Sequence, residues 1–219
     1  MASRPNQAIP RPVPRLYLTT PPIAEASAIS AQLASALEAG DVAAVLLRLI
    51  EVDDRTLINC AKAIAPPVQS RGCALLLESR TDLVARAGAD GAHLAGVEAF
   101  TDAIGQLKPE RIAGAGGLAT RHDAMLVAER GADYVMFGEP DPADKRPAFP
   151  AIEERVRWWA EVFEIPCVGY AATLEEIAPL VAAGADFVAV GDFVWKDALA
   201  MAATIREANR CLRLSEPAA

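Results

Sequence analysis

The chain alternates eight times between a short apolar run and a longer segment with helical spacing of apolar residues. The runs span residues 16–19, 43–47, 74–77, 91–94, 111–114, 134–137, 167–170 and 187–190. Apolar runs without polar alternation are typical of parallel strands that are covered on both faces. The helical segments lie at 23–39, 53–64, 82–87, 97–107, 122–130, 152–163, 174–183 and 195–211. Eight such units predict an α/β protein whose sheet closes into a (β/α)8 TIM barrel.

The alternative fold for this pattern is an open, doubly wound sheet. That fold places a glycine-rich phosphate turn after its first strand, whereas here Thr19 is followed by Thr20 and two prolines. A repeated Gly-Ala-Asp tripeptide, starting at Gly88, Gly131 and Gly184, favours the barrel. Each copy ends a helical segment and precedes an apolar run. We therefore expect each glycine at a helix C-terminus in the left-handed conformation, at the end of the barrel that supports stability.

Length and composition favour one globular domain. The chain has 219 residues, 53% of them hydrophobic, so we expect an N-terminal arm at 1–14, a single barrel domain at 15–212 and a C-terminal tail at 213–219.

The net charge of −8 disfavours nucleic acid as a partner. No apolar run reaches the ~18 residues that cross a membrane. The cysteines, at 60, 73, 167 and 211, are not clustered, which is typical of reduced thiols in a cytoplasmic protein.

Charged residues follow most of the predicted strands. Barrel enzymes carry their catalytic groups at the carboxyl ends of the strands, so these residues are candidates for a site. Cations there could hold an anionic substrate and acids could bind a metal, although rim charges also pair with one another in water. We expect five of them to project at one rim: Arg48, Glu78, Glu98, Lys145 and Asp192.

Several segments resemble the thiamine phosphate synthase/TenI family (the thiamine monophosphate synthase superfamily). GADGAHLAGVEAF at 88–100 is similar to the family segment GADGVHLGQEDL. GADYVMFGEPDPADK at 131–145 and the stretch 165–190 match two later family segments, and LYLTTP at 16–21 resembles the first strand. The similarity runs in chain order over residues 15–195.

This resemblance implies a transferase of thiamine biosynthesis. Members of the family join hydroxymethylpyrimidine diphosphate to a thiazole phosphate and release pyrophosphate, with Mg²⁺ neutralising the leaving group. It thus implies small, phosphorylated substrates, while the oligomeric state stays open.

Some family positions at strands 2 to 4 are substituted. The strand-2 motif Gln-x-Arg-x-Lys becomes Leu46, Arg48 and Ile50, so one cation survives, while the lysine and the glutamine that binds the pyrimidine are lost. The strand-3 Asn-Asp becomes Glu78-Ser79, which removes an aspartate that binds Mg²⁺. The strand-4 aspartate aligns with Glu98, which the resemblance makes the candidate metal ligand.

Positions at strands 5 and 6 diverge in the same way. The strand-5 serine falls on Gly116 or Gly117, and the histidine of the TenI-type tautomerases falls on Leu118 or Ala119. The loss of that histidine argues against a tautomerase. Lys145 matches the lysine that contacts pyrophosphate, so Arg48 and Lys145 are the candidate catalytic residues.

The phosphate-binding cup of the family is altered most. Its Gly-Gly after strand 7 becomes Ala171-Ala172, and its Val-Ser after strand 8 becomes Gly191-Asp192. The added methyl groups crowd an approach that glycine permits, and an aspartate repels phosphate unless it turns away or pairs with Lys196. The candidate substrate-binding residues are Glu78, Thr173, Gly191 and Asp192.

Three functional hypotheses follow from these substitutions. The chain could be a thiamine phosphate synthase with weak activity. It could instead act on another small ligand, one without a phosphate, or bind a ligand without doing chemistry. The loss of the strand-2 glutamine and lysine, the strand-3 aspartate and the strand-5 serine together predicts weak or no thiamine phosphate synthesis.

Overall fold

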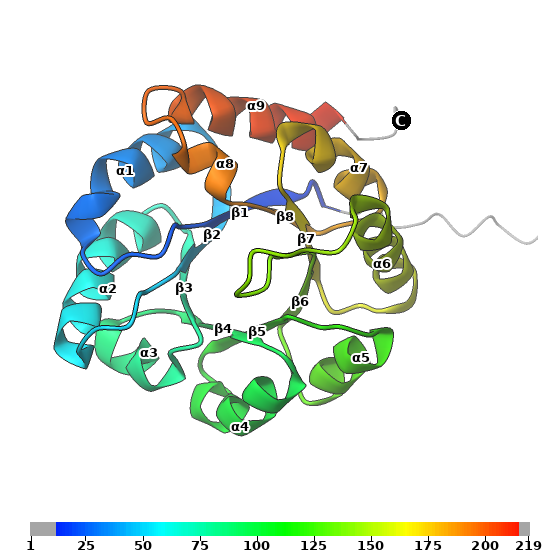
Figure 1. The fold of residues 1–219 in the computed structure, drawn as a ribbon, viewed down its shortest axis with the longest axis horizontal. Coiled ribbons are helices and arrows are strands. Elements are labelled where there is room, and N and C mark those ends of the chain that lie inside the picture. The colour runs from blue at the N-terminus through cyan, green and yellow to red at the C-terminus, as the bar shows by residue number, and fades with distance from the viewer. Residues whose placement is uncertain (1–11, 215–219) are drawn as a thin grey trace, which may run out of the picture.

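Eight parallel strands close into a barrel in the computed structural model, which describes residues 12–214 (Figure 1). The strands are β1 (Arg15–Thr19), β2 (Val42–Leu47), β3 (Ala74–Glu78), β4 (Gly91–Ala95), β5 (Ile112–Gly116), β6 (Tyr134–Phe137), β7 (Cys167–Ala171) and β8 (Phe187–Val190). Each strand pairs with its neighbours in chain order, and β1 pairs with β8 to close the sheet. The predicted (β/α)8 TIM barrel is confirmed.

A ring of helices covers the outside of the barrel (Figure 1). They are α1 (Ser30–Ala39), α2 (Asp54–Gln69), α3 (Thr81–Ala87), α4 (Val97–Leu107), α5 (Arg121–Glu129), α6 (Phe149–Val162), α7 (Ile177–Ala182), α8 (Asp192–Trp195) and α9 (Met201–Leu214), with 3-10 turns at Ala26–Ala28 and Leu174–Glu176. The last helix ends at Leu214, inside the stretch expected as a tail, and most of the expected arm lies outside the described residues. No helix within residues 12–214 is long and apolar enough to cross a bilayer.

Three segments differ from the sequence expectation. The helix expected at 195–211 begins only at Met201, since Asp197 accepts the N–H groups of Leu199 and Ala200 in a turn before it. The helix expected at 53–64 continues through Pro66 and Pro67 to Gln69. Both prolines lie on the exposed face, where water can satisfy the carbonyls that lose their helical partners, while buried Val68 extends the apolar stripe. The helix expected from residue 23 starts only at Ser30, because Ile23 forms a β-bridge with Leu49 instead.

The barrel interior holds its own cluster of side chains, separate from the core between sheet and helices. This inner cluster is lined by Tyr17, Ala44, Leu46, Leu76, Tyr134, Met136, Val168, Tyr170 and Ala189. Such a filled interior is usual for eight strands and leaves the strand ends as the place for a ligand. The inner cluster is unusual in containing three tyrosines, whose hydroxyl groups require partners.

The Gly-Ala-Asp repeat has the predicted structure at each of its three positions. Gly88, Gly131 and Gly184 follow helices with φ of 73°, 97° and 97°. Each aspartate exchanges two hydrogen bonds with the start of the preceding strand. For example, the Asp90 carboxylate accepts the Leu75 N–H at 2.7 Å, and the Asp90 N–H donates to the Leu75 carbonyl at 2.8 Å. These aspartates therefore link the strands at the amino-terminal end of the barrel.

Replacing Gly114 by alanine is expected to destabilise the barrel by about 2 kcal/mol. A Cβ at this position in β5 would lie 2.0 Å from a ring carbon of Tyr134, which cannot move without disturbing the inner cluster. Gly105→Ala is the matched control, because Gly105 lies in α4 with open space around its Cα and should gain about 1 kcal/mol of helix propensity. Urea unfolding of the two variants measures the difference. Equal midpoints would contradict the packing of Tyr134 against β5.

Candidate active site at the barrel mouth

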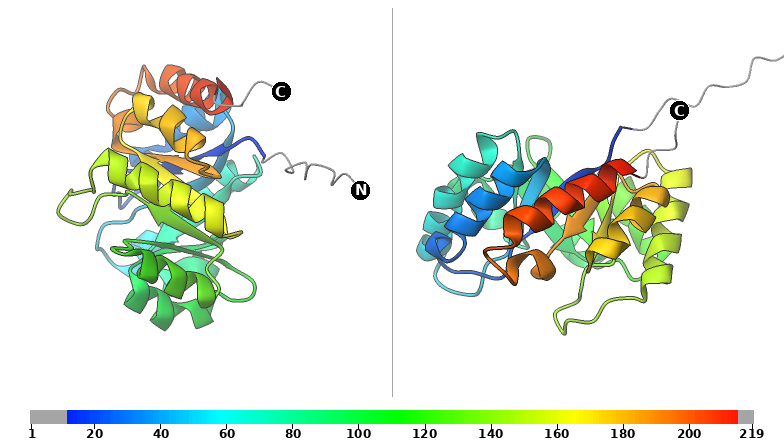
Figure 2. Two further views of the ribbon diagram at one scale, coloured as in Figure 1. Left: turned by 90° about the vertical axis from the view of Figure 1, so that its right-hand side faces the viewer. Right: turned by 90° about the horizontal axis from the view of Figure 1, so that it is seen from above.

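The five charged residues expected at one rim all lie at the carboxyl ends of the strands. Arg48 directly follows β2, Glu78 ends β3, Glu98 is in the first turn of α4, Lys145 is in the β6–α6 loop and Asp192 begins α8. In Figure 1 the β6–α6 loop extends toward the middle of the ring, and Figure 2 shows the same loop projecting from one end of the barrel. This end is called the mouth below.

Arg48 and Glu78 form an ion pair across the ends of β2 and β3. Arg48 Nε lies 3.4 Å from a Glu78 carboxylate oxygen, and the two side chains are 34% and 38% exposed. The backbone N–H of Arg48 donates to Thr20 Oγ1 at 3.0 Å, which fixes the start of the loop. A cation is thus present at the mouth, but an anionic ligand must compete with Glu78 for it.

The carboxylates expected to bind magnesium are not grouped around one point in the described residues. Glu98 is exposed and forms no salt bridge within residues 12–214. Glu78 is paired with Arg48, and the neighbouring Ser79 has no carboxylate. Within the described part of the chain, no group of three or more His, Cys, Asp or Glu side chains could hold a metal. Mg²⁺ in such a site would depend on one or two carboxylates, with substrate phosphates and water as its other ligands.

Lys145 sits in a turn that a single aspartate organises. Asp141 Oδ1 accepts the backbone N–H groups of Ala143 and Lys145 at 2.8 and 2.9 Å. Asp144 adopts a positive φ of 59°, which aspartate tolerates better than most residues. The side chain of Lys145 is exposed, so it is available to a ligand that enters the mouth.

A largely buried ion pair lies at the carboxyl end of β7. Arg146, also from the β6–α6 loop, binds Glu176 at 2.9 Å, and the two side chains are only 19% and 18% exposed. Glu176 in turn accepts the backbone N–H of Ala172 at 2.7 Å. Arg146 also donates to the Tyr170 carbonyl at 3.3 Å, while its Nε is buried without a hydrogen-bond partner among the described residues. A carboxylate of the chain itself therefore holds an amide at the end of β7.

The residues after β8 are arranged around two hydroxyl groups. A Cβ on Gly191 would lie 2.3 Å from the Tyr170 hydroxyl and 2.6 Å from Thr19 Oγ1, so only glycine fits between them. Asp192 is exposed and forms no salt bridge within residues 12–214, so of the two alternatives named for it the pairing with Lys196 is not seen. Thr173 is exposed, and its hydrogen bond to Glu175 lowers the pKa of that carboxyl.

A chain of polar side chains crosses the barrel interior below the mouth. The hydroxyls of Tyr17 and Tyr134 are 2.8 Å apart, and the Tyr134 hydroxyl lies 2.9 Å from His93 Nδ1. The His93 ring stacks on Tyr134 with centroids 5.7 Å apart. On the other side of the histidine, Nε2 lies 3.9 Å from Glu139 Oε1, which also accepts the Gly117 N–H. These contacts connect β1, β6 and β4 to Glu139 at the mouth.

Burial controls the charge state of this polar chain. Removal from water raises the pKa of both tyrosines and lowers the pKa of His93 to about 4, so all three are neutral at pH 7. The same effect raises the pKa of Glu139 to about 7, although hydrogen bonds from backbone N–H groups and the charge of Arg155 oppose it. A substantial fraction of Glu139 is therefore a neutral acid at physiological pH.

Comparison with known proteins defines the family. The model of the family described as thiamine monophosphate synthase matches residues 16–194. The chain belongs to this family. It is 41% identical over 202 residues to a thiamine-phosphate synthase of Rhodospirillum centenum, covering 91% of this chain and 98% of the relative. A thiamine-phosphate synthase of Hyphomonas neptunium is 39% identical over 212 residues, covering 93% and 96%.

A solved structure of the same fold is the thiamine phosphate pyrophosphorylase of Pyrococcus furiosus. It superimposes with a TM-score of 0.74 at 20% identity, over 93% of this chain and 97% of that chain. At this level of identity the similarity supports the barrel fold alone.

Glu139 lies against Gly116, one of the two positions on which the family's strand-5 serine falls. A Cβ on Gly116 would lie 1.9 Å from Glu139 Oε1 and 2.5 Å from His93 Nε2. A serine at position 116 could not coexist with Glu139 in this position. Gly116 and Glu139 are therefore sterically coupled at the floor of the mouth.

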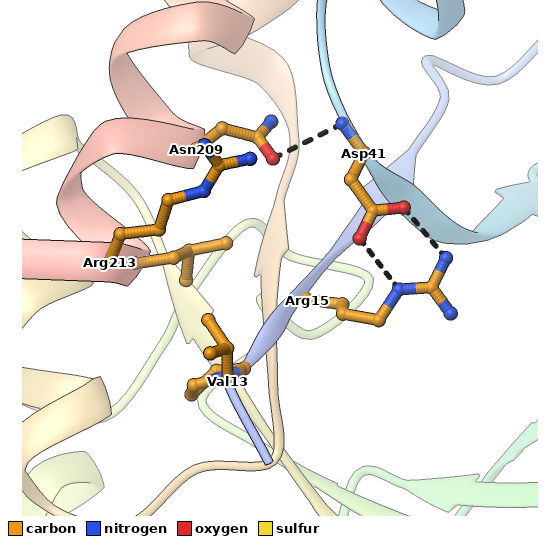
Figure 3. Close-up of a pocket in the computed structure, with 7 residues that line it drawn as sticks. Val13, Arg15, Asp41, Asn209 and Arg213 are labelled. Atoms are coloured by element: carbon orange, nitrogen blue, oxygen red, sulfur yellow. Dashed lines mark hydrogen bonds and ion pairs between the residues drawn. The ribbon is translucent and has the colours of Figure 1, made fainter. Parts of the chain in front are cut away.

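A separate cavity lies at the opposite end of the barrel. It encloses about 390 Å³ and is lined by residues including Arg15, Asp41, Asn209 and Arg213 (Figure 3). Arg15 donates two hydrogen bonds to Asp41, both at 2.7 Å, and the Asp41 N–H donates to Asn209 Oδ1 at 3.2 Å. These contacts join β1, β2 and α9, which indicates a structural role for this end.

Three residues of the mouth were not singled out from the sequence: Glu139, Arg146 and Glu176. The segment that 131–145 resembles reads GADYVGFGPVFPTxTK in the family, so Glu139 stands where that segment has a proline, and this difference is a signal that the sequence offers. Nothing in the sequence pairs Arg146 with Glu176, because they are thirty residues apart on different loops. Their contact follows only from the closed barrel, which brings the ends of β6 and β7 together.

Proposed function

We propose that this protein joins hydroxymethylpyrimidine diphosphate to thiazole phosphate, at a low rate, and releases pyrophosphate. The observation that supports this most is the position of Arg48 at the mouth, where the family has its strand-2 arginine. Similarity to thiamine-phosphate synthases over nearly the whole chain supports the same activity. The substrates would enter the mouth between the β2–α2 and β6–α6 loops.

The reaction needs charge stabilisation more than proton transfer. The bond between the pyrimidine methylene carbon and the diphosphate oxygen breaks, and its electron pair leaves with pyrophosphate. The thiazole nitrogen then donates its lone pair to the methylene carbon, which forms the C–N bond without loss of a proton. Arg48 and Lys145 would stabilise the negative charge that develops on the leaving group. The dry interior formed by the inner cluster would strengthen these interactions.

The test is product formation by the purified protein. Incubation with both family substrates should yield thiamine phosphate and pyrophosphate in equal amounts, detected by chromatography. Arg48→Gln should lower kcat/KM by about tenfold or more, since a charge-assisted contact to the leaving group is lost. Arg130→Gln, an exposed arginine at the end of α5 away from the mouth, is the control and should leave the rate unchanged. No product above the background reaction would refute the proposal.

One observation favours a second candidate, a family activity on an acceptor without phosphate. Glu176 occupies the Ala172 amide and neutralises Arg146 at the end of β7, where the family binds the thiazole phosphate. A thiazole alcohol would avoid repulsion by this carboxylate. Parallel assays with the thiazole alcohol and the thiazole phosphate distinguish the two, because only the second candidate predicts faster turnover of the alcohol.

A further inference from the structure

The carboxyl group of Glu139 is placed as a recognition element rather than as part of an ion pair. One of its oxygens accepts the Gly117 N–H and lies beside His93 Nε2. No arginine or lysine within residues 12–214 forms a salt bridge with it. The side chain keeps 19% of its surface exposed, above a histidine that belongs to the barrel interior. The Glu139 side chain is thus mostly buried and partly accessible at the floor of the mouth.

The chemistry of a neutral carboxyl group fits one kind of ligand edge. A protonated carboxyl presents an O–H donor beside a carbonyl acceptor. An aminopyrimidine presents the complementary pair, a ring nitrogen that accepts and an exocyclic N–H that donates. The amide of a glutamine offers the same donor and acceptor. At the strand-2 position of the family's pyrimidine-binding glutamine, this chain has Leu46, whose side chain is buried in the inner cluster and has no polar group.

We propose that the Glu139 carboxyl, held by the Gly117 N–H above His93, pairs with the aminopyrimidine edge of the substrate in place of the missing glutamine. This specificity role rests on the proposed function, because it takes the pyrimidine as one of the two substrates. The coupled glycine at position 116 supports it, since that glycine clears the space in which the carboxyl lies. Glu139 would act in binding, and the bond-making step would not pass through it.

Ionisation of Glu139 gives the proposal a pH signature. The groups that interact with it are Tyr17 from β1, His93 from β4, Tyr134 from β6, Glu78 from β3 and Arg155 from α6. Of these, His93 and Tyr134 stay neutral above pH 7. Because the pKa of Glu139 is about 7, the O–H donor is lost as the pH rises, and the carboxylate then repels the ring nitrogen. Binding of a neutral aminopyrimidine should weaken by roughly tenfold or more between pH 7 and pH 8.5.

The experiment uses 4-amino-2-methylpyrimidine as the probe and ligand-observed NMR titration of the full chain. Wild type should bind it with the stated loss between pH 7 and pH 8.5. Glu139→Gln keeps the shape, the donor and the acceptor but cannot ionise, so its affinity should be the same at both pH values. Glu139→Ala should lose binding, and 2-methylpyrimidine, which lacks the amino group, should bind none of the three proteins.

Either of two results on pH dependence would overturn the proposal. One is a wild-type affinity that does not change with pH. The other is a Glu139→Gln variant with the same pH dependence as wild type. Absence of probe binding by a folded wild-type protein would also reject it, even if the product assay shows thiamine phosphate formation. Conversely, pH-dependent probe binding without product formation would sustain the role of Glu139 and refute the proposed function.

Discussion

The purified protein is expected to form thiamine phosphate about a thousandfold more slowly than an ordinary enzyme with a turnover of ~1 per second. The side chains that would hold a magnesium diphosphate are incomplete, because Ser79 replaces a carboxylate and Arg48 is already paired with Glu78. The rate falls about tenfold for every 1.4 kcal/mol of transition-state stabilisation that a missing contact removes. Steady-state kinetics with both substrates measures the rate. Turnover near 1 per second would show that these substitutions are compensated.

Restoring one carboxylate should recover part of this loss. Ser79 is exposed at the end of β3 and has a φ of 58°, a conformation that aspartate and asparagine accept more readily than most residues. Ser79→Asp is expected to raise the rate by about tenfold in the presence of magnesium and to leave it unchanged without the metal. Ser79→Asn is the matched control, since it has the same shape without the charge. An equal gain in both variants would exclude a metal-dependent cause.

Inorganic phosphate at millimolar concentration is expected not to bind between the ends of β7 and β8. The structure changes the reason that the sequence suggests for this. Asp192 is exposed, so water screens its charge, and its repulsion at ~4 Å is closer to 1 kcal/mol than to the ~4 kcal/mol of a partly buried pair. Glu176 is the larger obstacle, because it occupies the Ala172 N–H and neutralises Arg146.

Two variants separate these contributions. Glu176→Gln leaves Arg146 with an uncompensated charge and is expected to improve phosphate affinity by more than tenfold, whereas Asp192→Ser should improve it severalfold. Glu175→Gln is the control, because the neighbouring Glu175 bonds to Thr173 and does not contact Arg146. Titration calorimetry with inorganic phosphate measures all three. A well-ordered anion on the Ala172 and Gly191 amides of the unmutated protein would contradict this prediction.

The fold was predictable because its signal is local and repeated. All eight expected strands overlap the observed ones to within two residues at each end, and the three Gly-Ala-Asp glycines have the expected backbone conformation. The rim position of Arg48, Glu78, Glu98, Lys145 and Asp192 follows directly from the parallel strands. Their proposed roles in binding and catalysis remain predictions.

The detailed site was less predictable because it depends on contacts between distant residues. Tyr17 and Tyr134 are 117 positions apart, and their hydrogen bond exists only because both face the barrel axis. The raised pKa of Glu139 likewise comes from burial beside His93 and β5, which no local pattern reveals. The sequence identified the missing family residues at the mouth. It could not show that Glu139 lies against Gly116 or that Glu176 accepts the Ala172 N–H.

The aspartates of the Gly-Ala-Asp repeat divide the barrel into consecutive pairs of strands. Asp90 ties β3 to β4, Asp133 ties β5 to β6 and Asp186 ties β7 to β8 through the same reciprocal bonds. For β1 and β2, the Arg15–Asp41 ion pair makes the corresponding link. Each link closes a short stretch of chain, which costs little entropy. A circular permutant opened between these pairs, before β3, β5 or β7, keeps all four links, whereas a break inside a pair separates one of them. The barrel is in this sense assembled from quarters, and new chain ends are best placed at the joints.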